Sequence, residues 1–224
     1  DVRLQASADV ETGHAAVFVD EGGENQIAVH LGANARLQPE DLDDDLLDSA
    51  SVFVTQLEIP FDTIRAAAER ARAAGAITIL NAAPFDPAAE ELLPLFDIAV
   101  LNRSEAEQLA GVGVASLDDA LAALRALKGM GTPAPVVTLG PAGAVYMDEG
   151  RGAHARSVDV EGVDATGAGD AFVGALAAFR RAGMSMQDAV DRACIYAAYA
   201  TTAAGAREAY LDADAFEPKV AHLA

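Results

Sequence analysis

The chain has 224 residues, of which 52% are apolar, so it can bury a sizeable core, and its length suits one domain better than two. Its formal net charge of −20 argues against general binding to nucleic acid or to a membrane surface, because both partners are polyanions. The first residues show no basic start and no apolar segment, no apolar run could span a bilayer, and the one cysteine, Cys194, excludes an internal disulfide. We therefore expect a cytoplasmic protein that holds any phosphate ligand through local backbone N–H groups and bound cations.

The front of the chain predicts a small β-hairpin. Two strand-like runs, His14–Asp20 and Gln26–Leu31, are separated by a short link that contains glycine and asparagine. An acidic helix is expected to follow, from Gln38 to Leu47, with leucines at helical spacing. We interpret residues 1–35 as a β-lid with its hinge and residues 36–224 as the α/β core.

From Ser51 onward, buried strands alternate with amphipathic helices. This pattern predicts a largely parallel sheet with helices on both faces, which closes on an antiparallel hairpin. The expected elements are a strand Ser51–Leu57, a helix Phe61–Ala74, strands Ala76–Leu80 and Ile98–Leu101, helices Ser104–Leu109 and Ser116–Leu127, a strand Ala134–Leu139, the hairpin strands Ala144–Met147 and Ala153–Val160, and helices Ala168–Ala182 and Met186–Ala203 before a short tail.

The most specific signal is the string Asp-Ala-Thr-Gly-Ala-Gly-Asp-Ala-Phe at residues 164–172. Its glycines let the backbone approach a ligand closely, and the helix that follows presents free N–H groups and the positive end of its dipole. Such a turn is an anion hole suited to the charge that develops on a transferring phosphoryl group. Asp170 falls in the first helical turn, where a carboxylate suits a base that takes a hydroxyl proton. The alternative is a glycine turn with a helix-capping Asp.

The full string resembles the signature Asp-Thr-Thr-Gly-Ala-Gly-Asp of ribokinase-like, or phosphofructokinase B-type, carbohydrate kinases, with Ala165 as a departure at its second position. The resemblance covers nearly the whole chain. It implies ATP-dependent phosphorylation of a sugar hydroxyl, with Asp170 as the catalytic base and the backbone of Gly167, Ala168 and Gly169 as the anion hole.

Two further strand-to-helix junctions match the family. Asn102 and Glu105 match its Asn-x-x-Glu motif, which organises Mg²⁺ and the phosphates largely through water. An amide and a carboxylate three residues apart share one face of a helix start, and Mg²⁺ prefers oxygen ligands. The alternative is a capping box without a ligand. Residues 138–143 resemble the nucleotide-binding turn, so the implied ATP-binding residues are Asn102, Thr138, Gly140, Gly143 and Gly169.

The front half resembles the ribokinase branch of the family in residues 12–19, 23–27, 30–35 and 56–60. This resemblance implies that the sugar contacts Glu58, Ile27 and Asp170, and that two copies pair through the lid hairpin. The alternatives are that Ile27 only belongs to the hairpin core and that Glu58 is a solvated residue at a helix start.

The resemblance also implies a monovalent cation, K⁺ or another, beside the anion hole. The matching positions are Asp164, Thr166, Ala203 and Gly205, mostly through carbonyl groups. The next residues, Arg-Glu-Ala at 207–209, depart from the family's usual polar sequence with proline.

Two family motifs have no counterpart in this sequence. They are the first strand with its Asn-x-Asp sugar contact and the Gly-Gly-Lys-Gly-Ala-Asn loop. We expect the sequence to be part of a longer protein, because loss of a central strand would expose an apolar sheet edge.

Three classes of function remain to be compared. The leading hypothesis is a sugar kinase that acts on ribose, and related kinases for fructose, a keto-deoxy sugar acid or a nucleoside are alternatives. A sensor that binds nucleotide or sugar without turnover would not need the base Asp170. A dinucleotide-binding enzyme is disfavoured, because the glycine loop follows the last strands and lacks the fingerprint spacing.

Overall fold

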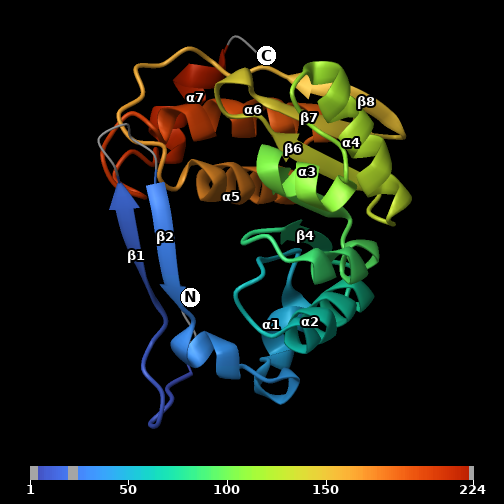
Figure 1. Ribbon diagram of the computed structural model, residues 1–224, viewed down its shortest axis with the longest axis vertical. Coiled ribbons are helices and arrows are strands. Elements are labelled where there is room, and N and C mark those ends of the chain that lie inside the picture. Colours follow the sequence, from blue (N-terminus) through green and yellow to red (C-terminus); the bar gives the residue numbers. More distant parts are fainter. Residues whose placement is uncertain (1–4, 20–24, 222–224) are drawn as a thin grey trace.

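A computed structural model describes residues 5–19 and 25–221, with only the backbone at positions 17, 19 and 25–27. Strands β1 (His14–Val19) and β2 (Asn25–His30) form an antiparallel two-stranded sheet in which His14 pairs with His30. This hairpin lies to one side of the core (Figure 1). The expected hairpin is thereby confirmed, although its linking residues 20–24 lie outside the described part.

The core is a six-stranded sheet with the strand order β3-β4-β5-β6-β7-β8. Its strands are β3 (Val52–Thr55), β4 (Ile77–Asn81), β5 (Ile98–Asn102), β6 (Ala134–Thr138), β7 (Ala144–Asp148) and β8 (Arg151–Ala155). The pairs from β3 to β6 are parallel, and β6-β7-β8 are antiparallel. Between β7 and β8, Glu149 (φ 46°) and Gly150 (φ 81°) both take positive φ, as a two-residue hairpin turn requires.

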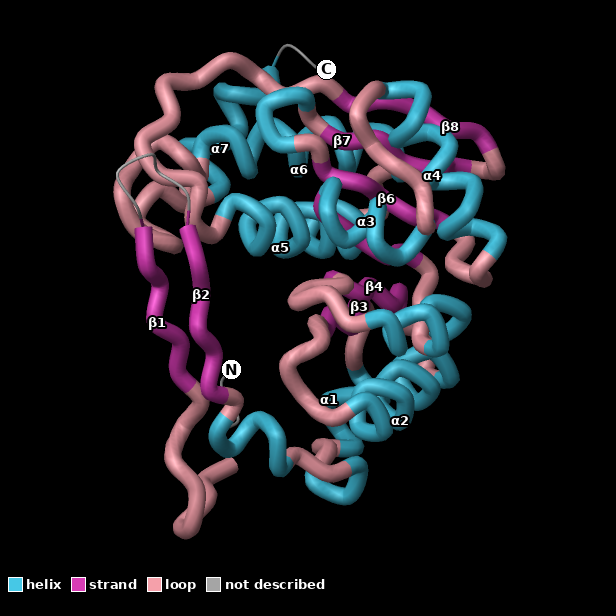
Figure 2. The backbone as a smooth tube through the Cα atoms, in the orientation of Figure 1, coloured by secondary structure: helices cyan, strands magenta, loops and turns pink. Residues whose placement is uncertain are grey.

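Helices cover both faces of this sheet, as the alternating pattern predicts (Figure 2). The α-helices are α1 (Asp44–Ser49), α2 (Phe61–Ala73), α3 (Arg103–Ala110), α4 (Leu117–Gly129), α5 (Ala168–Arg181), α6 (Met186–Tyr199) and α7 (Ala213–Val220). Short 3₁₀ turns occupy Gly32–Arg36, Pro39–Asp41, Pro87–Glu91, Leu93–Leu95 and Gly140–Ala142. No helix in the described ranges is long and apolar enough to cross a bilayer.

The two faces of the sheet have separate apolar cores. Phe96, Leu101 and Leu124 belong to the core under α2, α3 and α4, and all three are almost completely buried. Val136 and Leu176 belong to the core under α5 and α6, and both are fully buried. These opposed cores fix which strand ends and helix starts meet at the carboxyl edge of the sheet, where α/β proteins bind ligands.

Three expected elements have other bounds in the structure: the acidic helix, strand β8 and helix α6. The acidic helix from Gln38 to Leu47 is divided, because Leu42 is extended and the Asp43 side chain caps a new helix by accepting from Leu46 N. Strand β8 ends at Ala155 instead of Val160.

Helix α6 ends at Tyr199 instead of Ala203, where the hydroxyls of Thr201 and Thr202 donate to the carbonyls that end the helix. The tail, for which no element was predicted, contains α7, whose start is capped by the Asp212 side chain.

Candidate active site

The candidate anion hole lies at the start of α5. Gly167 precedes the helix with φ +79°, and a Cβ atom at this position would lie 2.3 Å from Ala206 O, so glycine is required. Asp170 lies in the first turn, and its residue is exposed. Among the described residues, the N–H groups of Gly169 and Asp170 have no hydrogen-bond acceptor. The Gly167 N–H is likewise free among the described residues, whereas the Ala168 N–H, also expected in the anion hole, donates to Ala165 O at 3.2 Å. The turn therefore presents three free donors and one carboxylate.

Asp164 connects this turn to the loop after α6. Its Oδ2 accepts from Gly205 N at 2.9 Å and its Oδ1 from Thr166 N at 2.9 Å. These hydrogen bonds, that of Gly205 first, lower the pKa of Asp164, so its carboxylate is ionised at neutral pH. The Asp164 N–H in turn donates to Thr201 O at 3.1 Å. Of the residues expected around a monovalent cation, Asp164, Thr166 and Gly205 are thus in direct contact, and Ala203 lies in the same loop.

Tyr210 is a further contact of the turn that the sequence analysis missed. Its hydroxyl donates to Gly167 O at 2.9 Å across 43 residues of sequence. Tyr210 follows the segment that departs from the family pattern, and no sequence motif marks it.

Asn102 and Glu105 form a reciprocal pair at the start of α3. Asn102 Oδ1 accepts from Glu105 N at 2.9 Å, and Glu105 Oε2 accepts from Asn102 N at 2.7 Å. This is the capping-box geometry. Glu105 is only 7% exposed, and burial raises its pKa, opposed by the hydrogen bond from Asn102. Its Oε1 accepts no hydrogen bond from the residues that the structure describes, so it is available to a metal-bound water.

The expected nucleotide-binding turn lies beside Asn102. Strands β5 and β6 place Asn102 opposite Thr138, at the carboxyl ends of two parallel strands. After them, Gly140 has φ +62° and Gly143 has φ +90°, and a Cβ atom on Gly143 would lie 2.0 Å from Ala155 O. The glycine at 143 is therefore required by the backbone, whatever it binds.

The residues expected to contact the sugar, Glu58 and Ile27, make no hydrogen bond in the described ranges to the candidate anion hole or to the Asn102–Glu105 pair. Glu58, half-buried after β3, accepts from Gln56 Nε2 at 2.5 Å, and its own N–H donates to Gln56 Oε1 at 2.6 Å. No hydrogen bond or ion pair in the described ranges links it to Asp170 or Glu105. Ile27 pairs with Val17 in the hairpin, and its side chain lies outside the described part.

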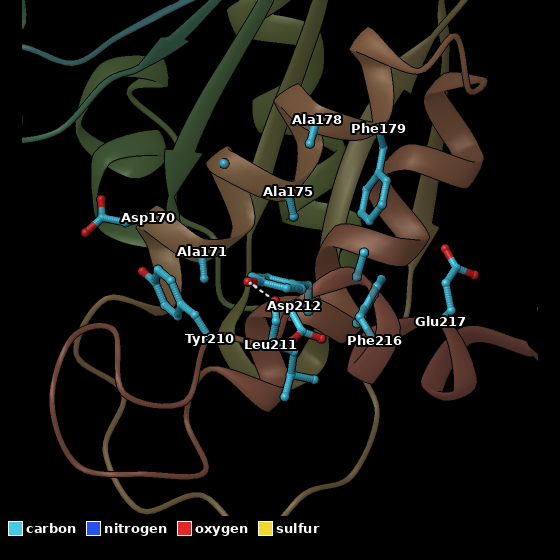
Figure 3. A pocket seen from close by; sticks show the side chains of 13 residues that line it. Asp170, Ala171, Ala175, Ala178, Phe179, Tyr210, Leu211, Asp212, Phe216 and Glu217 are labelled. Atoms are coloured by element: carbon cyan, nitrogen blue, oxygen red, sulfur yellow. Dashed lines mark hydrogen bonds between the residues drawn. The ribbon is translucent and has the colours of Figure 1, made fainter. Parts of the chain in front are cut away.

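A cavity of about 290 Å³ opens next to Asp170, between α5, α6 and α7. Figure 3 shows Asp170 and Tyr210 at one end of it, and Phe216 and Glu217 toward the other. Its remaining lining residues are Ala171, Gly174, Ala175, Ala178, Phe179, Tyr196, Leu211, Asp212 and Ala213.

Comparison with known proteins gives consistent matches. The family model described as "pfkB family carbohydrate kinase" matches residues 1–213. A ribokinase of Staphylococcus aureus is 35% identical over 188 residues, which are 83% of this chain and 62% of the relative. A deoxyribokinase of Salmonella typhi is 33% identical over 211 residues, which are 92% of this chain and 68% of the relative. The chain thus spans roughly two thirds of the length of these relatives.

Solved structures agree with this comparison. A ribokinase of Thermotoga maritima superimposes with a TM-score of 0.84 at 29% identity, over 95% of this chain and 70% of that chain. The structure of Arabidopsis thaliana ribokinase complexed with ribose and ATP gives a TM-score of 0.86 at 27% identity, over 94% of this chain and 69% of that chain.

Proposed function

The chain belongs to the pfkB family of carbohydrate kinases, and from this premise we propose that the protein transfers the terminal phosphoryl group of ATP to a sugar hydroxyl. One observation carries the proposal beyond family membership. Asp170 lies in the first turn of α5, next to the N–H groups of Gly169 and Asp170, which have no acceptor among the described residues. A base and an anion hole at the same point are what phosphoryl transfer to a hydroxyl needs.

In the proposed reaction, the Asp170 carboxylate takes the proton of the sugar hydroxyl while the oxygen of that hydroxyl attacks the terminal phosphorus of ATP. The new O–P bond forms as the bond to the bridging oxygen of ADP breaks. The free N–H groups at the start of α5 hold the charge on the transferring oxygens, together with the helix dipole. General-base catalysis of this kind contributes about 10²–10⁴-fold to rate.

Two cations fit the residues at this edge. Glu105, with Oε1 free of hydrogen bonds in the described part, and Asn102 would hold Mg²⁺ through water. Bound Mg²⁺ would neutralise charge on the phosphates. Asp164, Thr166, Ala203 and Gly205 offer an ionised carboxylate and carbonyl groups, which suit K⁺ or another monovalent cation.

Ribose is the first-choice substrate in this proposal, because relatives at 35% identity are ribokinases. The deoxyribokinase match favours 2-deoxyribose as a second candidate. The two sugars differ at one hydroxyl, and a site that hydrogen-bonds a hydroxyl rejects an analogue without it strongly. We assign Glu58 and Ile27 to the sugar side of the site.

We also propose that two copies pair through the hairpin, residues 14–30. Phe18 is 62% exposed and Val29 is 48% exposed on this hairpin. A two-stranded sheet is marginally stable without a further surface to pack on. Sedimentation of wild type and a Phe18→Ser variant tests the pairing, and an unchanged assembly state would refute it.

The test of the kinase activity uses the protein as its gene encodes it. ADP release is measured with Mg²⁺-ATP and ribose, 2-deoxyribose, fructose, a keto-deoxy sugar acid or a nucleoside. We expect the highest kcat/KM with ribose. Tight nucleotide binding by calorimetry without turnover on any of these acceptors would support a sensor and refute the kinase proposal.

A further inference from the structure

We propose that Tyr210 is a positioning residue for phosphoryl transfer, because it holds the Gly167 carbonyl and thereby the first turn of α5. This inference rests on the proposed kinase function. Tyr210 lies 43 residues from Gly167, and its hydroxyl donates to Gly167 O at 2.9 Å. The same oxygen accepts from Ala171 N at 2.8 Å, the first hydrogen bond of the helix. The Gly167 carbonyl is thus held from two directions.

The hydrogen bond from Tyr210 matters because Gly167 has no side chain to restrain its backbone. The residue has a positive φ of +79°, and the backbone of Ala206 lies too close to admit a Cβ atom. Glycine is the residue with the greatest conformational freedom, so the turn depends on contacts from outside it for a single conformation. Asp164 restrains the turn before Gly167, through Thr166 N and Gly205 N. Tyr210 restrains it at the helix start itself.

Tyr210 is itself fixed by the aromatic cluster around the cavity. Its ring centroid lies 6.1 Å from that of Tyr196, whose hydroxyl donates to Leu211 O at 2.9 Å, the dashed line in Figure 3. The Tyr196 ring meets Phe216 edge-on at 5.2 Å. The Tyr196 ring, which phenylalanine at that position would keep, therefore packs against the Tyr210 ring and helps to fix the position of its hydroxyl.

The surroundings also keep Tyr210 a donor. Burial, and then the negative charge of Asp170, raise the pKa of its phenol. The phenol therefore stays protonated at the pH at which a carboxylate base works. Tyr210 lines the same cavity as Asp170. Its hydrogen bond to Gly167 O orders the segment that carries both the base and the free donors.

The chain offers a matched control in Tyr196. Both tyrosine hydroxyls donate to a backbone carbonyl at 2.9 Å, both rings line the same cavity, and both pKa values are raised mainly by burial. Only the Tyr210 bond reaches the glycine turn. Phenylalanine at either position removes one hydroxyl and keeps the ring.

The experiment compares Tyr210→Phe and Tyr196→Phe with wild type, in steady-state kinetics with ATP and sugar. We expect Tyr210→Phe to lower kcat about tenfold, as loss of one positioning hydrogen bond would, with both KM values changed less than about twofold. Tyr196→Phe should keep the wild-type kcat. Both variants should lower the melting temperature to a similar extent. Equal effects of the two variants on kcat would overturn the proposal and leave Tyr210 a purely structural residue.

A second measurement does not depend on which reaction the protein catalyses. Amide hydrogen exchange without substrate should rise at Ala168 and Ala171, whose N–H groups are hydrogen-bonded in this turn, in Tyr210→Phe, and at residues 211–216 in Tyr196→Phe. Unchanged exchange at Ala168 and Ala171 in Tyr210→Phe would refute the positioning role. If wild type has no sugar kinase activity but this exchange pattern is found, the kinase proposal fails and the structural coupling of Tyr210 to the turn stands.

Discussion

Glu105 and Asn102 close a reciprocal pair of hydrogen bonds in which each side chain accepts from the other residue's backbone N–H, at 2.7 and 2.9 Å. The pair uses one oxygen of each side chain, and the Glu105 carboxyl is buried. A capping box does not need a buried charge, since glutamine can take the place of glutamate in it. Stability and Mg²⁺ dependence of a Glu105→Gln variant therefore distinguish a carboxylate that only caps α3 from one that also binds a metal ion.

The first prediction concerns stability. Burial raises the pKa of Glu105 above its ordinary value of 4.5. The contribution of protonated Glu105 to the free energy of unfolding is therefore fully present below pH 4.5 and is lost as pH rises through the folded pKa. Glu105→Gln keeps an oxygen that accepts from Asn102 N and removes the titration. We expect the melting temperature of the variant to equal or exceed that of wild type at pH 7, and the two to converge below pH 4.5. A variant that is much less stable at pH 7 would contradict this.

The second prediction concerns metal dependence in the same variant. If Glu105 holds Mg²⁺ through water, Glu105→Gln should shift the Mg²⁺ concentration for half-maximal activity upward by about tenfold, as mutations of groups around a metal do. The KM for sugar should change little. Superimposable Mg²⁺ titrations would mean that the pair only caps α3.

The third prediction concerns the base. Asp170→Asn keeps the size of the side chain but cannot take a proton, so kcat should fall by about 10²–10⁴-fold while ATP still binds in calorimetry. Asp212→Asn is the control, because Asp212 lines the same cavity and asparagine can replace it as the cap of α7. Near-normal turnover in Asp170→Asn would refute the proposed mechanism.

The fourth prediction concerns the glycine before α5. Gly167 and Gly183 have nearly the same φ, +79° and +82°, but a Cβ atom would meet Ala206 O at 2.3 Å at the first and nothing within 4 Å at the second. Gly183→Ala should cost about 1–2 kcal/mol in free energy of unfolding, the strain of left-handed backbone alone. Gly167→Ala should cost clearly more and abolish turnover. Equal losses in urea unfolding would show that the turn can move away from Ala206.

The fifth prediction concerns Cys194. Burial, and then the charge of Asp191, raise the pKa of its thiol from 9.0 to about 12. Native protein at pH 8 should therefore resist iodoacetamide, and denatured protein should react, as followed by mass spectrometry. Because the folded pKa is raised, stability should fall as pH rises from about 9 toward 12, and less so in Cys194→Ala. Rapid native alkylation would contradict the burial of this thiol.

Local sequence determined the succession of elements and the most specific motif. Strands such as β5 and helices such as α5 were predicted within one or two residues of their ends, because side-chain periodicity records which face is buried. The string at 164–172 identified the turn before α5, since only glycine tolerates the backbone of Gly167. The resemblance of these same residues to a known family was confirmed by the family match.

The tertiary structure decided what local patterns cannot record, the partners that are distant in sequence. Asp164 meets Gly205 across 41 residues, Tyr210 meets Gly167 across 43, and no periodicity predicts either contact. The same holds for α7, whose Phe216 is buried against Ile195 and Tyr196 of α6 and Phe179 of α5. Hydrogen bonds and burial depend on atoms brought together by the whole fold, whereas propensity acts between neighbours along the chain. For that reason the glycine loop was visible in the local sequence, Asp164 and Gly205 were placed together only through the family resemblance, and Tyr210 was missed.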